Sequence, residues 1–178
     1  PLAALALAAP LAAQSSTLDQ FSPFSSEVGG TSAQGASYNF SASTLTWQME
    51  SVAGIAGQLE GFELELIGAV GSSIDMAILL GPGWQAGTPV WTGSYAKLTG
   101  NTEIAWIDVT SANIQLAAGD SYVIQVIGTD TGVNGTGSFE SPVNTQYGPP
   151  LFLNGNLFNP EWRIGFHTYM LTGPSLTA

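Results

Sequence analysis

The stretch Phe62-Glu63-Leu64-Glu65-Leu66 decides the fold class of this chain. Successive side chains of a strand point to opposite faces, so the three apolar residues share one face while Glu63 and Glu65 share the other. No window of the sequence shows a convincing apolar period of about 3.6 residues, which an amphipathic helix would require. The stretch therefore predicts a strand with one buried face and one face in water.

Similar short runs recur along the chain, separated by turn sequences such as Gly81-Pro82-Gly83 and Asn134-Gly135. They cover residues 44–52, 74–80, 89–93, 103–109, 122–127, 151–153 and 162–171. Run 122–127 is apolar on both faces, which predicts a central strand, and Gly119 before it predicts a tight turn. About eight or nine strands spaced in this way predict an all-β fold, a jelly-roll-like antiparallel β-sandwich.

The length of 178 residues predicts one domain, preceded by two segments of different composition. Residues 1–14 form an Ala/Leu-rich run that resembles a signal-peptide remnant or forms an N-terminal extension. This run is shorter than the ~20 apolar residues of a membrane span. A Ser/Gly-rich segment follows at 15–43, and the β-sandwich domain is expected over 44–178.

The charge balance is strongly acidic, with two basic residues, Lys97 and Arg163, against thirteen acidic ones and a net charge of −11. Such a chain repels phosphate backbones, which excludes nucleic acid as a partner. Only 8% of the residues are charged, so uncharged polar residues supply most of the surface, a composition that favours an exported, extracellular or cell-surface protein. The absence of Cys excludes disulfides and thiolate chemistry.

Four stretches resemble a family of bacterial secreted jelly-roll β-sandwich domains found in exported proteins of the PEP-CTERM type. They are residues 58–64 (QLEGFEL), 78–81 (ILLG), 116–123 (LAAGDSYV) and 162–169 (WRIGFHTY). The resemblance covers about two thirds of the chain. It implies a sandwich closed by the last of these stretches and a role in envelopes, matrices or adhesion. Residues 171–178 lack the sorting tag itself.

The chain offers few residues for catalysis, and we expect it not to be an enzyme. His167 is its sole histidine, and no G-x-S-x-G elbow is present, so a hydrolytic triad has no support. Glu63 and Glu65 have a spacing that an acid glycosidase could use, but alternating Glu is equally typical of a solvent-facing strand. An acid glycosidase therefore stays the weakest alternative.

Calcium is the one cofactor that the sequence suggests, because it takes oxygen ligands from acidic loops. The best loop is 130–135, with Asp130 and Asn134 as ligands and Asp120 and Glu140 as neighbours. The competing interpretation is turn chemistry, since Asp and Asn tolerate turn conformations.

Glycan binding is a second candidate, because sugar rings stack on exposed aromatic side chains. Trp84, Trp91, Tyr95 and Tyr147 lie in or beside Gly/Pro-rich loops and are the predicted contacts. Trp47, Trp106 and Trp162 lie in predicted strands, and we expect them in the core.

Self-association is a third candidate, through residues 1–16 adding a strand to a second copy. Leu5, Leu7 and Leu11 would make these contacts, and Pro10 restricts the strand to a sheet edge. The sequence thus predicts a non-enzymatic extracellular structural protein, a subunit of a surface layer, matrix or filament. The alternative is a carbohydrate-binding or adhesive module. The expected partners are further copies of the chain or an extracellular glycan, with no integral membrane segment.

Overall fold

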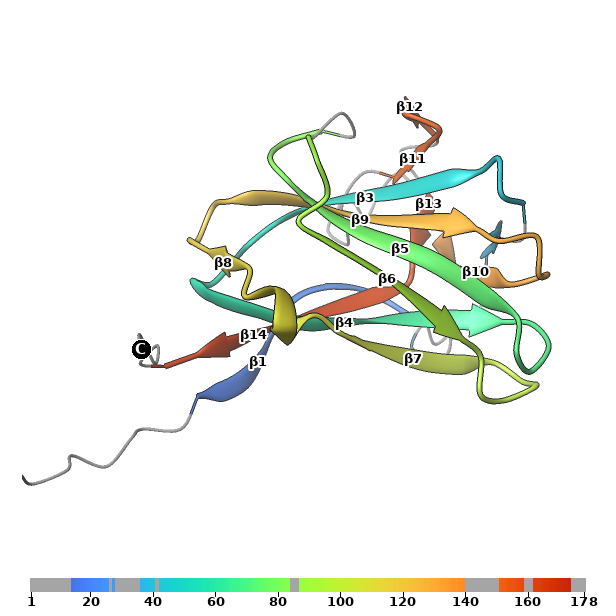
Figure 1. Cartoon of the computed structure of the whole chain (residues 1–178), viewed down its shortest axis with the longest axis horizontal. Coiled ribbons are helices and arrows are strands. Elements are labelled where there is room, and N and C mark those ends of the chain that lie inside the picture. The colour runs from blue at the N-terminus through green and yellow to red at the C-terminus, as the bar shows by residue number, and fades with distance from the viewer. Residues whose placement is uncertain are drawn as a thin grey trace, which may run out of the picture.

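Two antiparallel β-sheets packed face to face form the body of the protein (Figure 1). The computed structural model describes residues 14–25, 27, 36–40, 42–83, 87–139, 151–158 and 162–173. Within these residues the one helical element is a 3-10 turn, η1 (Thr110–Ala112). The predicted all-β sandwich is confirmed.

Sheet A has eight strands and sheet B has six. Sheet A contains β1 (Ser15–Ser22), β2 (Ala36–Asn39), β4 (Gly57–Ile67), β7 (Glu103–Asp108), β8 (Gln115–Leu116), β10 (Asn134–Phe139), β13 (Trp162–Ile164) and β14 (Phe166–Thr172). Sheet B contains β3 (Thr46–Val52), β5 (Ser73–Leu80), β6 (Trp91–Ala96), β9 (Ser121–Gly128), β11 (Leu151–Leu153) and β12 (Asn156–Leu157).

The chain changes sheet repeatedly, between β3 and β4, β4 and β5, β6 and β7, and β8 and β9, which gives the sandwich its jelly-roll-like character. In sheet B, β9 pairs with β3 on one side and β5 on the other, so the predicted central strand is confirmed. Gly119, in the turn before it, has a φ of 95°, which fits the tight turn expected there.

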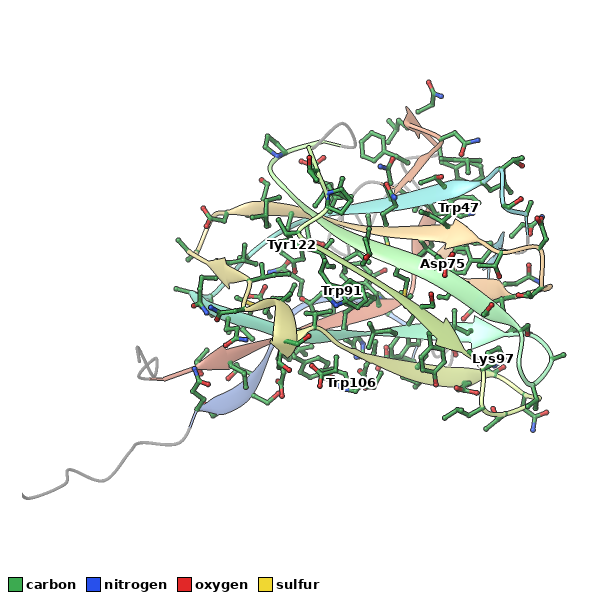
Figure 2. All side chains as sticks on the ribbon, viewed as in Figure 1. Trp47, Asp75, Trp91, Lys97, Trp106 and Tyr122 are labelled. Carbon is green, nitrogen blue, oxygen red and sulfur yellow. The ribbon has the colours of Figure 1, made fainter. Side chains whose placement is uncertain are left out.

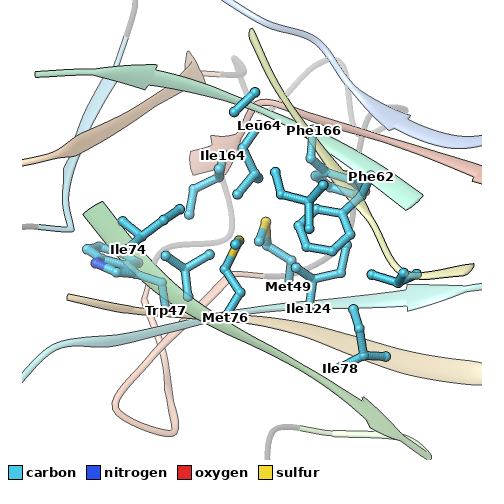
Figure 3. Packing of buried hydrophobic residues seen from close by; sticks show 14 of the residues in the cluster. Trp47, Met49, Phe62, Leu64, Ile74, Met76, Ile78, Ile124, Ile164 and Phe166 are labelled. Atoms are coloured by element: carbon cyan, nitrogen blue, oxygen red, sulfur yellow. The ribbon is translucent and has the colours of Figure 1, made fainter. Parts of the chain in front are cut away.

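The core fills the space between the sheets (Figure 3). Phe62, Leu64, Ile164 and Phe166 of sheet A face Trp47, Met49, Ile74, Met76, Ile78 and Ile124 of sheet B. Burying each such side chain stabilises the folded protein by about 1.5–3 kcal/mol. Because alternate side chains of a strand share one face, a strand gains this stabilisation when its alternate residues are apolar. The prediction that Phe62, Leu64 and Leu66 form the buried face of this strand is thus confirmed.

The strand count of eight or nine is wrong, because several strands are too short or too polar to show alternation. Two of them, β1 and β2, lie inside segment 15–43 and are strands of sheet A. Strand β1 is exposed along much of its length and is held by pairing with β14. It is also fastened through the Asp19 carboxylate, which accepts the N–H groups of Gly54 (2.8 Å) and Ile55 (2.9 Å).

Two glycines explain further differences from the sequence prediction. Asn134-Gly135 was predicted as a turn but begins β10, where a Cβ on Gly135 would lie 2.3 Å from the Phe40 ring. The closing strand, predicted as one run over 162–171, is divided into β13 and β14 at Gly165. There the Gly165 N–H donates to the Thr136 carbonyl at 2.8 Å, and Phe24 packs where a side chain would stand.

Candidate functional site

One row of side chains crosses the outer face of sheet A, the face turned away from sheet B. The register places Phe21 of β1 opposite His167 of β14, His167 opposite Glu63 of β4, and Glu63 opposite Trp106 of β7. Directly opposite residues of paired strands lie on the same face. Four segments far apart in sequence therefore present their side chains to one surface.

Trp106 lies at one end of this row, on the side of β7 away from sheet B (Figure 2). A Cβ on Gly61 would stand 2.6 Å from the indole ring, so the absence of a side chain there lets the indole lie across the sheet. Tyr169 meets the indole edge-on, with 5.4 Å between ring centroids. Trp106 nevertheless remains 41% exposed. We call Trp106, Tyr169, Glu63 and Phe21 the aromatic platform.

Glu63 occupies the centre of the platform. Its Oε2 accepts a hydrogen bond from the Tyr169 hydroxyl at 2.9 Å and lies 3.1 Å from Nδ1 of His167. Burial, the hydrogen bond to Glu63 and nearby negative charge raise the pKa of Tyr169 to about 12. Tyr169 therefore keeps its proton at neutral pH and orients the carboxylate.

His167 joins the platform to a turn that follows β1. Its Nε2 lies 3.2 Å from Oε2 of Glu27, and its ring packs on Phe24 with 4.2 Å between centroids. Phe21 meets the same ring edge-on at 6.3 Å. His167 is thus largely enclosed, with 13% of its side chain exposed.

The expectation that the acidic face of β4 lies in water is wrong for Glu65, because this residue is only 1% exposed. Its Oε2 accepts the Ser25 N–H at 2.6 Å and also the Thr136 hydroxyl. Glu63 keeps 25% of its side chain exposed. The two carboxylates named for a glycosidase thus have different environments, and Glu65 is covered by the turn.

The predicted glycan contacts on β6 lie away from the platform. Trp91 and Tyr95 are half-buried and pack against the core between the sheets, and Trp91 meets Phe62 edge-on at 6.2 Å. The Tyr95 hydroxyl donates to Glu103 at 2.5 Å. Trp84 and Tyr147, the other predicted contacts, lie outside the described residues.

Asp130 and Asp120, two of the residues predicted for a calcium site, take part in turns. Asp130, at φ 59°, accepts the Ser43 N–H at 2.9 Å, and hydrogen bonds from the side chain and the backbone of Ser43 lower the pKa of Asp130. Asn134 lies in β10, and Asp120 accepts the Ala117 N–H at 2.7 Å. Glu140 lies outside the described residues, and those that are described include no group of three or more His, Asp or Glu side chains able to hold a metal ion.

The proposed assembly residues Leu5, Leu7 and Leu11 also lie outside the described residues. No helix in the described part of the chain is long and apolar enough to cross a membrane.

A shallow groove of about 440 Å³ lies where β5 ends, lined by Leu80, Pro82, Leu116 and Asp120 among others. In this groove, Oδ2 of Asp120 accepts the Ala117 N–H of its own turn at 2.7 Å.

Trp106 is the functional candidate that sequence reasoning missed, because it was predicted to lie in the core. The sequence does contain a sign of this, because Ala105 and Ile107 are the buried alternate positions of β7 and leave Trp106 on the opposite face. Two further facts were needed and could not be read from the sequence. One is the pairing of β7 with β4, and the other is the placement of Gly61 beneath the indole.

Comparison with models of protein families, with curated proteins and with solved structures found no match to this chain.

Proposed function

We propose that this protein is a non-enzymatic extracellular binding module that holds a polysaccharide on the aromatic platform. One observation supports the proposal above the others. The Trp106 indole lies across Gly61, remains 41% exposed and stands beside the Tyr169–Glu63 hydrogen bond.

The chemistry of sugars fits this surface. A pyranose ring presents C–H groups that stack on an aromatic face, while its hydroxyls need hydrogen-bond acceptors close by. Trp106 offers the stacking face, and the partly exposed Glu63 carboxylate offers acceptor oxygens on the same side of the sheet.

The negative charge of the surface disfavours acidic polysaccharides as ligands. The exposed side of the platform carries the carboxylates of Glu63, Glu27 and Asp108, and the whole chain has a net charge of −11. Uronate-rich or sulfated polymers are therefore repelled. Neutral or amino-sugar polymers are the expected ligands.

Substitution of Trp106 tests this proposal. Trp106→Ala should reduce retention on insoluble cellulose or chitin at least about ten-fold, because the stacking surface is lost. The free energy of unfolding should fall by about 1–2 kcal/mol, because the indole also packs over Gly61 and against Tyr169, and the variant should stay folded under the conditions of the binding assay. Affinity electrophoresis and a pull-down on each polymer measure retention, and urea unfolding measures stability.

Leu98→Ala is the matched control, since it removes an apolar side chain that is 74% exposed in the connection between β6 and β7. This variant should bind as the parent does. Equal retention of parent and Trp106→Ala on every neutral and amino-sugar polymer, or preferential retention on alginate, would contradict the proposal.

A structural role in an extracellular assembly is the second candidate. The observation that favours it is the place of β1, which directly follows residues 1–14 and pairs within the described chain only with β14. A strand at the edge of a sheet can accept a strand from another copy.

A further inference from the structure

The turn formed by Phe24, Ser25 and Glu27 is fastened to the outer face of sheet A. Within the turn, the Glu27 N–H donates to the Phe24 carbonyl at 3.0 Å, and the Phe24 N–H donates to Oε2 of Glu27 at 2.8 Å. The carboxylate of Glu27 is therefore held in place by its own turn. Ser25 reaches Glu65 of β4, and Phe24 is buried against His167 and Gly165.

His167 is the point at which this turn meets the platform. Oε2 of Glu63 lies 3.1 Å from its Nδ1, and Oε2 of Glu27 lies 3.2 Å from its Nε2. A neutral imidazole has one N–H and can donate to only one of these carboxylates, so its other nitrogen directs a lone pair at the second. An imidazolium ion donates to both.

We propose that His167 is a proton-dependent latch that holds the Phe24–Glu27 turn on sheet A. The groups that surround the ring are acidic or neutral. They are Glu63 from β4, Glu27 from the turn, and Tyr169 from β14, whose hydroxyl is bonded to Glu63. Glu65, two residues further along β4, binds the Ser25 N–H of the same turn. The Phe24 ring, stacked at 34° to the imidazole, also favours a cation there.

The direction of the effect follows from the proton count. Histidine is the side chain that changes charge between about pH 5 and 8. As the pH rises through the range in which His167 loses its proton, one of its two carboxylate contacts is lost. We expect the hydrogen bond to Glu27 to be the one that is lost. Its side chain is 44% exposed, against 25% for Glu63, so water can solvate the released carboxylate.

The test uses the fact that His167 is the sole histidine of the chain. Imidazole ¹⁵N chemical shifts report its protonation state directly, and hydrogen exchange at the Ser25 N–H, bonded to Glu65, reports opening of the turn. After correction for the intrinsic pH dependence of exchange, opening should become about five- to ten-fold more frequent as His167 loses its proton. At the acidic end of the titration, both ring nitrogens should carry protons.

Two variants separate the latch from a general change in stability. His167→Gln should remove the pH dependence of Ser25 opening. Glu27→Gln, at an exposed side chain, should raise opening already at acidic pH while His167 still titrates. Glu50→Gln, on β3 of the other sheet, is the charge-matched control and should behave as the parent. The same pH profile of Ser25 opening in the parent and both latch variants would overturn the proposal.

Discussion

Glu103 organises the connection between the two edge strands β6 and β7. Its carboxylate accepts hydrogen bonds from the Tyr95 hydroxyl (2.5 Å), the Leu98 N–H (3.0 Å), and the N–H (2.7 Å) and hydroxyl (2.9 Å) of Thr99. The buried Lys97 Nζ lies 3.6 Å away. Burial alone would raise the pKa of Glu103, but the hydrogen bonds outweigh it and lower the pKa to about 2. The ionised carboxylate is therefore part of the folded structure.

Acid should weaken the fold through this residue. Because the pKa of Glu103 falls from 4.5 to about 2 on folding, its contribution is complete above pH 4.5 and is lost as the pH falls towards 2. Glu103→Gln should lower the free energy of unfolding by about 2 kcal/mol at pH 7 and by much less at pH 2. Urea unfolding across this range measures the difference, with Glu50→Gln as the control. An equal loss at both pH values would contradict the prediction.

Tyr95, Glu63 and Glu65 show how much of a side chain's environment can be predicted from its place in the sequence. Tyr95 was chosen as a glycan contact because it precedes a loop, and nothing in its neighbourhood indicated that its hydroxyl would bind Glu103. Glu63 and Glu65 were correctly placed on one face of β4. Their different exposure depends on the Phe24–Glu27 turn, which is distant in sequence and shows no pattern of its own.

At the scale of elements, β10 begins with Asn134-Gly135, a sequence typical of a turn, and this end of the strand depends on close packing between Gly135 and the Phe40 ring. Gly135→Ala should lower the free energy of unfolding by about 1–3 kcal/mol, because the added Cβ would lie 2.3 Å from the Phe40 ring. Gly87→Ala is the control, since nothing lies within 4 Å of a Cβ there. Urea unfolding followed by fluorescence compares the two variants. Equal stability would show that Phe40 moves aside without cost.

Strands with a buried alternate row were the elements that could be predicted. The structure has β3, β5, β7 and β9 near their expected bounds, whereas β4 extends beyond the expected 62–66 at both ends. Burial of one face imposes a period of two on β7, and burial of both faces makes β9 apolar along most of its length. Strands such as β1, β8 and β12 have no such row, and pairing with neighbours that the sequence does not identify holds them in the sheets.

For the molecule as a whole, the sandwich was predictable, and the platform was not, because it needs the register of four strands at once. Assembly is the remaining prediction at this scale. If residues 1–14 add a strand to another copy, polymers of the parent chain should be absent from a chain that lacks these residues. Negative-stain electron microscopy and light scattering compare the two chains, with far-ultraviolet circular dichroism as the control for folding. Polymers that persist after the deletion would exclude this mode of assembly.

The pairing of β1 with β14 also determines how the protein responds to tension. Ser15 lies opposite Thr172, so the outer ends of these two antiparallel strands leave the sheet at the same place. A force applied through both ends would separate the pair like a zipper, one hydrogen bond at a time, instead of shearing all of them together. Single-molecule pulling should therefore detach β1 at low force and leave the rest of the sandwich folded. An extracellular material built from this unit would yield first at that seam, unless its links transmit load through other strands.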